Sequence, residues 1–538
     1  MRRRSSWFRA LPAGLLLFSA AVLLVCSGTS PLYRGHDWTD ANTYLTMGRS
    51  LLQGVVPYRD LFDHKGPLLY GIYALGALLH PQGFYGIFLL QVLSLAATLY
   101  ALYQAARALG AEPAPSLLCV CALPFFLLSA GVYYLPKRLD YGGGSAEEFC
   151  LPLLAAALHL SAHCHAKGCW SFRALTGLGA LAGAVFQIKF NLILFFAGLS
   201  APVFLLDLFK RDTRRFAVHL GGFALGFGGS LVPYLLYGTA THSLRACWRA
   251  YFCFNVSYAQ GDAASAETLA IRTLSAAWST VCTTPILAAA LLLFLLGMAA
   301  LVRRSGIQAC LSPLGAFSAL ALAIFVGQVM PYTLLPLLLS PFYGLMSLAS
   351  RLPAASMRRA NIPILAVGIA LAAVVQNQML FHRASAWLAP PTCQEAVAAL
   401  IRSGPWDTPT LLEAGMLSRG FYNQLGLVPE TYYFYCPNVS DDQHPEILRC
   451  QLQSITAAKV NYVVLQSSQP VLSPVLPPED ARLAQLYQAV LQNYTPVGVI
   501  PGTGAVNHLY YHLFQQIPPT EPPTPGETFF FFFRQSML

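Results

Sequence analysis

Ionisable residues crowd into one stretch of the chain, Gly35 to Pro67, which separates two very apolar segments. An aspartate carboxylate can take up a proton from a reacting group, and lysine or histidine can hold an anion. Holding charged side chains together beside membrane segments costs free energy, so such clusters usually serve a function. This stretch is therefore where we first expect chemistry. The residues concerned are Asp37, Asp40, Asp60, Asp63, His64 and Lys65.

Composition defines the kind of protein that must position these residues. Of the 538 residues, 56% are hydrophobic and only 10% are charged, and the mean hydropathy is +0.53. A soluble globule of this length would need more polar surface, so the sequence predicts a mainly α, polytopic helical membrane protein. The net charge of +10 does not indicate a nucleic-acid partner. Lys and Arg lie in short clusters between apolar runs, as expected of cytoplasmic loops.

The apolar runs predict the membrane segments. A helix needs roughly 20 residues to cross a bilayer, so the longest runs fit either one crossing or two. Placing all the basic clusters on one side of the membrane decides between one crossing and two for these runs. The run 66–106 then crosses once, after an interfacial helix at 67–80, whereas 174–206 and 305–350 each cross twice. The prediction is about eleven crossings, with Lys189 at an external hairpin tip. The runs are 10–33, 66–106, 113–136, 149–166, 174–188, 190–206, 216–244, 273–302, 305–350 and 361–381.

The same charge pattern predicts the orientation in the plasma membrane. The basic start, MRRRSSWFR, is expected in the cytoplasm and is followed by an uncleaved signal anchor. The loop 34–67 and everything after the last crossing then lie outside. This divides the chain into a transmembrane part, 1–381, an external α/β domain, 382–518, and a Pro/Phe-rich tail, 519–538, that is expected to be disordered and ends with the run Phe529–Phe533.

The external domain shows strand and helix signals in alternation. Runs rich in β-formers are predicted as strands, and the stretches 394–402 and 479–492 as helices. Three cysteines, Cys393, Cys436 and Cys450, are compatible with one disulfide and one remaining thiol. No C-x-x-C or H-E-x-x-H motif indicates zinc. The predicted strands are 410–413, 460–466, 495–500 and 508–514. N-glycosylation sequons begin at Asn255, Asn438 and Asn493.

The first loop resembles that of a known family. Asp40 and Tyr44 are followed by a helical segment at 47–54 and by Asp63-His64-Lys65-Gly66-Pro67 before an apolar helix. This arrangement resembles the first external loop of C-type (GT-C) glycosyltransferases, in particular the family 39-like branch that includes the lipid A aminoarabinose transferases and is related to the protein O-mannosyltransferases. Later landmarks agree over roughly residues 10–350. They are 142–148 (GGGSAEE) opening a helix, Lys189 after a Gly/Ala-rich helix, and Pro331-Tyr332 before another helix.

The resemblance implies an integral membrane glycosyltransferase. Such enzymes take a sugar from a polyprenyl-phosphate donor and transfer it to an envelope glycan, lipid or protein on the non-cytoplasmic face. The attacking hydroxyl must lose a proton, for which a carboxylate is the natural general base. Asp40 matches the family's loop carboxylate, with Asp37 as the nearby rival. The alternative is that Asp40 only caps the helix that runs to about Gln53.

The resemblance also assigns cations to the donor phosphate. Lys189 corresponds to the family's lysine near that phosphate, with snorkelling at a helix end as the alternative. His64 and Lys65 match a basic pair before the juxtamembrane helix, although here a glycine precedes the proline. Arg59 is a further candidate, and Arg59 and Lys65 are equally explained as anchors for membrane lipid headgroups.

The second external loop carries Glu147 and Glu148, where relatives have a second acid. These two residues could bind a metal, contact the acceptor or only provide negative charge at a helix N-terminus. The sequence therefore leaves open whether the protein needs a divalent cation. Tyr332 is a weaker candidate for the same acceptor or metal role. A transporter or flippase for an envelope lipid or glycan is the alternative function, although no paired repeat is visible. A non-catalytic scaffold would not explain why the acids cluster in the first loop.

Overall fold

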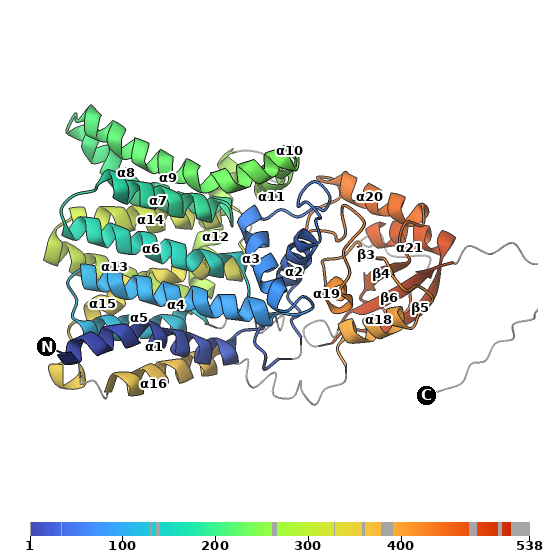
Figure 1. Cartoon of the computed structure of the whole chain (residues 1–538), viewed down its shortest axis with the longest axis horizontal. Helices are drawn as coiled ribbons and strands as arrows, with labels where there is room; N and C mark the ends of the chain where they lie inside the picture. The colour runs from blue at the N-terminus through green and yellow to red at the C-terminus, as the bar shows by residue number, and fades with distance from the viewer. Residues whose placement is uncertain are drawn as a thin grey trace, which may run out of the picture.

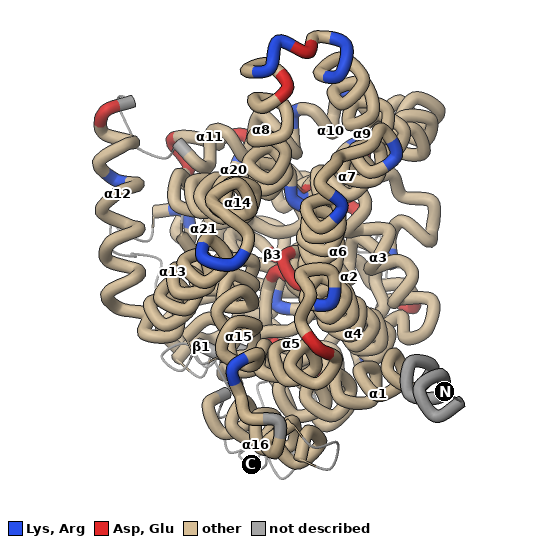
Figure 2. The backbone as a smooth tube through the Cα atoms, turned by 90° about the vertical axis from the view of Figure 1, so that its left-hand side faces the viewer, with Lys and Arg blue, Asp and Glu red and all other residues tan. Residues whose placement is uncertain are grey.

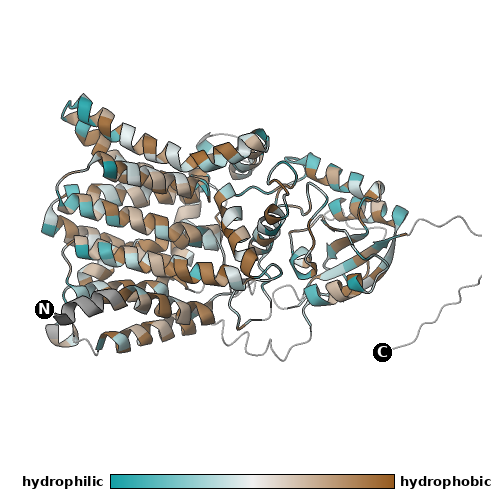
Figure 3. Cartoon of the chain, in the orientation of Figure 1, coloured by the Kyte–Doolittle hydropathy of each residue, from teal (hydrophilic) through white to brown (hydrophobic). Residues whose placement is uncertain are grey.

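The structure, a computed structural model, describes residues 2–33, 35–129, 131–135, 140–260, 266–327, 329–357, 361–377, 391–472, 481–503 and 508–517. The predicted tail 519–538, with Phe529–Phe533, lies outside these ranges. Figure 1 shows three layers along the longest axis: a bundle of long helices, a small middle layer containing α2 and α3, and an α/β region. Figure 3 shows that hydrophobic residues dominate the length of the bundle helices, whereas hydrophilic ones cover the outer faces of the α/β region.

Apolar runs of membrane length form the bundle. Within the described ranges, six helices are long and apolar enough to cross a bilayer, and the bent pair η3 and α15 makes a seventh candidate. Four shorter apolar helices, α1, α5, α7 and α16, lie in the same bundle (Figure 1). Together these elements match the runs predicted to cross. The bundle elements are α1 (Arg2–Cys26), α4 (Tyr85–Ala108), α5 (Pro113–Leu127), α6 (Ala146–Ala166), α7 (Phe172–Phe186), α8 (Ile193–Phe209), α9 (Thr213–Ala240), α13 (Pro285–Ser305), α14 (Gln308–Phe325), η3 (Pro331–Leu339), α15 (Phe342–Ala349) and α16 (Asn361–Asn377).

One predicted crossing has different bounds. The run 273–302 is broken at Thr284, so α12 (Ala266–Thr283) and α13 are separate helices. The cause is Pro285, because a proline disfavours the helical conformation of the residue before it. Figure 2 shows α12 at the edge of the bundle, beside α13. The crossing predicted from this run is therefore α13 alone.

The basic clusters that were predicted to share one side lie at one end of the bundle. Figure 2 looks onto this end, where Lys and Arg occupy the turns between helices. Lys210 and Arg211 lie in the α8–α9 turn, and Arg214 and Arg215 follow in the first turn of α9. The opposite end of the bundle carries α2, α3 and the α/β region (Figure 1).

The middle layer is built on a close helix contact. α2 (Thr39–Leu52) and α3 (Pro67–Leu79) cross at Gly48, where a Cβ atom would lie 2.6 Å from the backbone of Tyr73 and Ala74. Only glycine allows this approach, which fixes α2 against α3. The predicted helix at 67–80 is thus confirmed as a short element separate from α4. Smaller elements complete this end of the bundle: η1 (Phe190–Leu192), α10 (Leu244–Cys247), the π-helix η2 (Trp248–Cys253), α11 (Phe254–Gln260), and the strands β1 (Tyr134–Leu135) and β2 (Asp140–Tyr141) of the α5–α6 connection. η4 (Ala354–Met357) lies between α15 and α16.

The α/β region has a four-stranded sheet in the order β3-β4-β6-β5. β3 and β4 are parallel, and the other pairs are antiparallel. The strands β3 (Leu411–Ala414), β4 (Tyr462–Ser467), β5 (Tyr494–Pro501) and β6 (Tyr510–Gln516) coincide closely with the predicted runs. The helices α18 (Cys393–Arg402) and α21 (Ala481–Asn493) match the two predicted stretches, whereas α19 (Phe421–Leu425) and α20 (Pro445–Thr456) were not predicted. The three cysteines of this region are free thiols, so the suggested disulfide is not formed.

Candidate functional site

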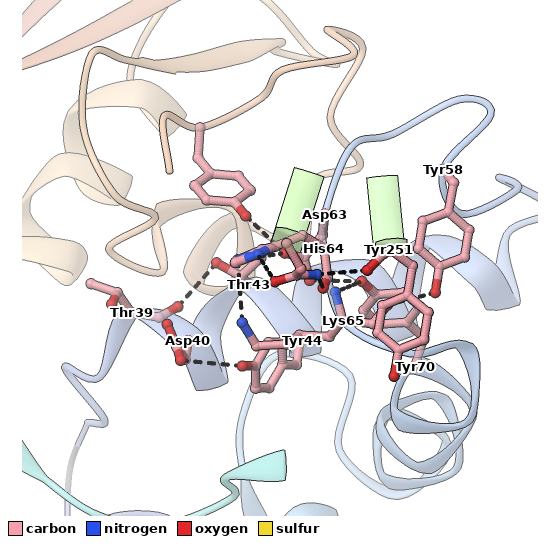
Figure 4. Close-up of polar contacts among 12 residues, drawn as sticks. Thr39, Asp40, Thr43, Tyr44, Tyr58, Asp63, His64, Lys65, Tyr70 and Tyr251 are labelled. Atoms are coloured by element: carbon pink, nitrogen blue, oxygen red, sulfur yellow. Dashed lines mark hydrogen bonds and ion pairs between the residues drawn. The ribbon is translucent and has the colours of Figure 1, made fainter. Parts of the chain in front are cut away.

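A cavity of about 1120 Å³ lies where the bundle, the middle layer and the α/β region meet. Six of the residues singled out from the sequence line it: Asp40, Asp63, His64, Lys65, Lys189 and Tyr332. They come from α2, the loop before α3, the α7–η1 junction and η3, so segments nearly 300 residues apart in the chain converge here. Figure 4 shows Asp40, Tyr44, Asp63, His64 and Lys65 close together.

Asp40 is held by two tyrosines. It is the second residue of α2, whose N-cap is Trp38, so the alternative that Asp40 is the N-cap does not hold. Tyr44 Oη, one turn further along α2, donates to Asp40 Oδ2 at 3.2 Å, and Tyr332 Oη donates to the same oxygen at 3.1 Å. Burial, and then the charge of Asp40, raise the pKa of Tyr44, which keeps its hydroxyl a donor. Within the described ranges, Oδ1 has no hydrogen-bond donor.

Asp63 is a second carboxylate on the cavity wall, held in the same way. Tyr70 Oη donates to its Oδ2 and Tyr435 Oη to its Oδ1, each at 2.8 Å. Asp63 is only 1% exposed, and these two hydrogen bonds satisfy both of its buried oxygens. The sequence drew attention to Asp63 but assigned it no role, and nothing in the sequence pointed to Tyr435.

His64 and Lys65 form a hydrogen-bonded pair. Lys65 Nζ donates to His64 Nε2 at 3.2 Å and lies 5.9 Å from the centre of the Tyr44 ring. His64 Nδ1 lies 3.1 Å from Asn255 Oδ1. Burial, and then the charge of Lys65, lower the pKa of His64 to about 3. His64 is therefore neutral at physiological pH, and Lys65 carries the positive charge of the pair.

Gly66 explains why a glycine stands between the basic pair and Pro67. Its N–H donates to the carbonyl oxygen of Ile188 at 3.2 Å, and a Cβ at Gly66 would lie 2.1 Å from the carbonyl oxygen of Gln187. No other residue fits so close to another backbone. The contact brings the His64–Lys65 loop against the end of α7, next to Lys189.

Lys189 is paired with a carboxylate. Its Nζ forms an ion pair with Glu147 Oε1; the Lys189 side chain is 19% exposed and that of Glu147 only 2%. Lys189 lies between α7 and α8, at the hairpin tip predicted for it, and Glu147 is in the first turn of α6. Since an unpaired buried carboxylate is costly, each residue of the pair stabilises the charge of the other.

Four residues proposed from the sequence lie outside the cavity lining: Glu147, whose ion pair with Lys189 is described above, and Glu148, Asp37 and Arg59. Glu148 closes a capping box with Ser145 at the start of α6 and also accepts from Gln91. Asp37 Oδ1 accepts from Gln394 of α18 at 3.2 Å. Arg59 forms an exposed ion pair with the neighbouring Asp60, at 2.7 Å. Glu148 thus contacts the bundle and Asp37 the α/β region, whereas Arg59 contacts its own loop and also donates to the carbonyl oxygen of Thr241 at the end of α9, at 2.9 Å.

The cavity wall has an apolar part and a more polar part. Apolar side chains of α8, α12 and α14 line the part within the bundle, and polar residues of the α/β region, among them Arg419, line the opposite part. Among the described residues, no group of three His, Cys, Asp or Glu side chains is arranged to hold a metal ion. The apolar lining includes Leu194, Leu269, Leu322, Ile324 and Val326, and the polar lining also includes Asn438 and His508.

Comparison with known proteins identifies the fold. No protein-family model matches the sequence, and no curated protein sequence matches it either. The solved structure of ArnT from Cupriavidus metallidurans bound to undecaprenyl phosphate matches with a TM-score of 0.59 and 12% identity, over 95% of this chain and 99% of that chain. The apo structure of the same protein matches with a TM-score of 0.55 and 11% identity, over 96% and 98%. The chain therefore has the fold of C-type glycosyltransferases, as the first loop predicted.

Proposed function

We propose that this protein is an integral membrane glycosyltransferase of the plasma membrane, which transfers a sugar from a polyprenyl-phosphate donor to an envelope acceptor on the non-cytoplasmic face. One observation carries the proposal: a single cavity combines Asp40 Oδ1, a carboxylate oxygen that accepts no hydrogen bond from any described residue, with Lys65 Nζ, an ammonium group that no described carboxylate pairs with. In this view residues 1–381 form the membrane-embedded catalytic part and 382–518 an external domain.

The two ends of the cavity fit the two ends of such a donor. The apolar wall within the bundle suits a polyprenyl chain, and the lysines lie beyond it, where a lipid phosphate would meet water. The matching ArnT structure was solved with undecaprenyl phosphate, which supports this lipid class. Lys65 forms no ion pair with any carboxylate in the described part of the chain, whereas Lys189 forms one with Glu147.

The chemistry follows from the position of Asp40. An acceptor hydroxyl attacks the anomeric carbon, the bond from that carbon to the phosphate oxygen breaks, and the polyprenyl phosphate leaves with the electron pair. Asp40 Oδ1 takes the hydroxyl proton as general base. The tyrosine hydroxyls on Oδ2 hold the carboxylate in place, so the other oxygen stays available. Lys65, with Lys189 beside it, stabilises the negative charge that builds up on the leaving phosphate.

The acceptor would enter from the side of the α/β region. Arg419, Asn438 and His508 line this part of the cavity, so the external domain would bind the acceptor and hold its hydroxyl near Asp40. An envelope glycan, a lipid or a protein would each meet these side chains.

The test is an assay of transfer in proteoliposomes. The purified full-length protein would be given polyprenyl-phosphate sugars labelled in the sugar, together with envelope extracts as acceptors. We expect label in an acceptor fraction and none with the Asp40→Asn variant. Movement of the labelled lipid between leaflets without any transfer of sugar would instead indicate the flippase alternative.

A further inference from the structure

Asn255 has an orientation that its hydrogen bonds fix completely. Its Nδ2 donates one hydrogen to the carbonyl oxygen of His64 at 2.7 Å and the other to that of Tyr251 at 2.9 Å. Because carbonyl oxygens can only accept, the amide cannot be turned around. Asn255 Oδ1 must therefore face His64 Nδ1, 3.1 Å away.

This orientation determines where His64 carries its proton. Asn255 Oδ1 only accepts, so Nδ1 of His64 must be the protonated nitrogen. On the other side of the ring, Nε2 lies 3.2 Å from Lys65 Nζ, which only donates, so Nε2 must be unprotonated. A second proton on the ring would place two positive groups in contact.

The other groups around His64 are consistent with a neutral ring. Asp63 Oδ1 lies 4.0 Å from Nε2, and both its oxygens are taken by tyrosines. The rings of Phe254 and Tyr258 approach the imidazole at 5.1 and 6.0 Å. The charges of Asp40 and Lys189 act in opposite directions, and burial has the largest effect, against the charged form.

We propose that Asn255 is a positioning residue for the donor site: it fixes His64 as the neutral Nδ1–H tautomer, and His64 Nε2 in turn holds the Lys65 ammonium at the cavity wall without neutralising it. The inference rests on the proposed function, in which Lys65 meets the donor phosphate. It gives His64 a different role from a phosphate-binding cation. It also argues against glycosylation at the Asn255 sequon, because both amide hydrogens are donated and an attached glycan would replace one of them.

The first test compares two substitutions of His64, with undecaprenyl phosphate as the probe. Glutamine presents an acceptor close to the position of Nε2, whereas asparagine is too short and reaches only the position of Nδ1. Losing a hydrogen bond to a charged group should weaken binding about tenfold in His64→Asn and in Asn255→Leu. His64→Gln should bind only about threefold more weakly than the wild type. Equal losses in His64→Asn and His64→Gln, or stronger binding in His64→Arg, would overturn the proposal, because the positive charge or mere packing would then be what matters.

The second test does not depend on turnover. In ¹⁵N NMR of the histidine-labelled full-length protein, the signal that is lost in His64→Gln should report Nδ1–H and an unprotonated Nε2 at pH 7. In Asn255→Leu that signal should show a mixture of tautomers. An Nε2–H or doubly protonated ring would refute the role of Asn255, even if the protein transfers sugar. Failure of the wild type to bind undecaprenyl phosphate or transfer sugar, with the Nδ1–H signal present, would count against the proposed function and not against this tautomer.

Discussion

Replacing Asp40 with asparagine separates catalysis from folding. Tyr44 and Tyr332 both donate to Asp40 Oδ2, so in Asp40→Asn the amide oxygen must take that position. The amide NH₂ then occupies the place of Oδ1, the oxygen that faces the substrate in our mechanism. The substitution thus keeps both tyrosine contacts and replaces the proton acceptor with a donor.

The expected magnitudes differ enough to be told apart. Removing general-base catalysis typically costs on the order of 10²–10⁴-fold in rate, or roughly 3–5 kcal/mol of transition-state stabilisation. Asp40 lies in the first turn of α2, where loss of a negative charge costs only about 0.3–1 kcal/mol of helix stability. Transfer should therefore fall at least a hundredfold, by the same principle, while the amount of folded protein in the membrane stays close to the wild-type level.

The assay is sugar transfer in proteoliposomes, with the thermal midpoint of the purified protein measured in parallel. Asp37→Asn is the matched control, because Asp37 lies three positions earlier and binds Gln394 outside the cavity lining. It should have a milder effect. Near wild-type transfer in Asp40→Asn together with loss in Asp37→Asn would make Asp37 the base. If neither substitution matters, this cavity is not the catalytic centre.

Three further predictions test the neighbours and the topology. Lys189→Ala should raise the KM for the donor, and it should lower the free energy of unfolding by about 3 kcal/mol or more because Glu147 is left as an unpaired buried charge. Adding Glu147→Gln to this variant should restore the thermal midpoint but not the affinity for the donor. Recovery of both would mean that the ion pair is purely structural. A reporter active only in the cytoplasm should be active when fused after Arg304 and silent at residue 400, and activity at 400 would overturn the predicted orientation. Burial lowers the pKa of His64 to about 3, against about 6.5 in an unfolded chain, so the contribution of the neutral ring to stability is complete above pH 6.5 and is lost as the pH falls towards 3. The thermal midpoint of His64→Gln should therefore fall less over this range than that of the wild type. An identical fall in the wild type and the variant would contradict the lowered pKa of His64.

Much of the architecture could be predicted because it depends on local patterns. Apolar runs of membrane length predicted the bundle helices, and short runs rich in β-formers predicted the strands of the sheet, since run length and composition are properties of a single segment. The Asp40–Tyr44 contact is also local, because residues four apart share one face of a helix. The break at Thr284 was missed although Pro285 is a local signal, because the run of apolar residues around it was counted as one segment.

Other parts of the site have no signal in any single segment. Tyr332 reaches Asp40 across 292 positions, Tyr435 reaches Asp63 across 372, and Lys189 reaches Glu147 across 42. Which side chains meet at such separations depends on the order and angle in which helices associate, and hydropathy does not encode this. The sequence by itself determined the membrane-length helices, the α/β region and the loop whose residues line the cavity. Only the tertiary structure decided which of the described acids has an oxygen that accepts no hydrogen bond and which lysine is paired with a carboxylate, because both depend on partners brought in from distant segments.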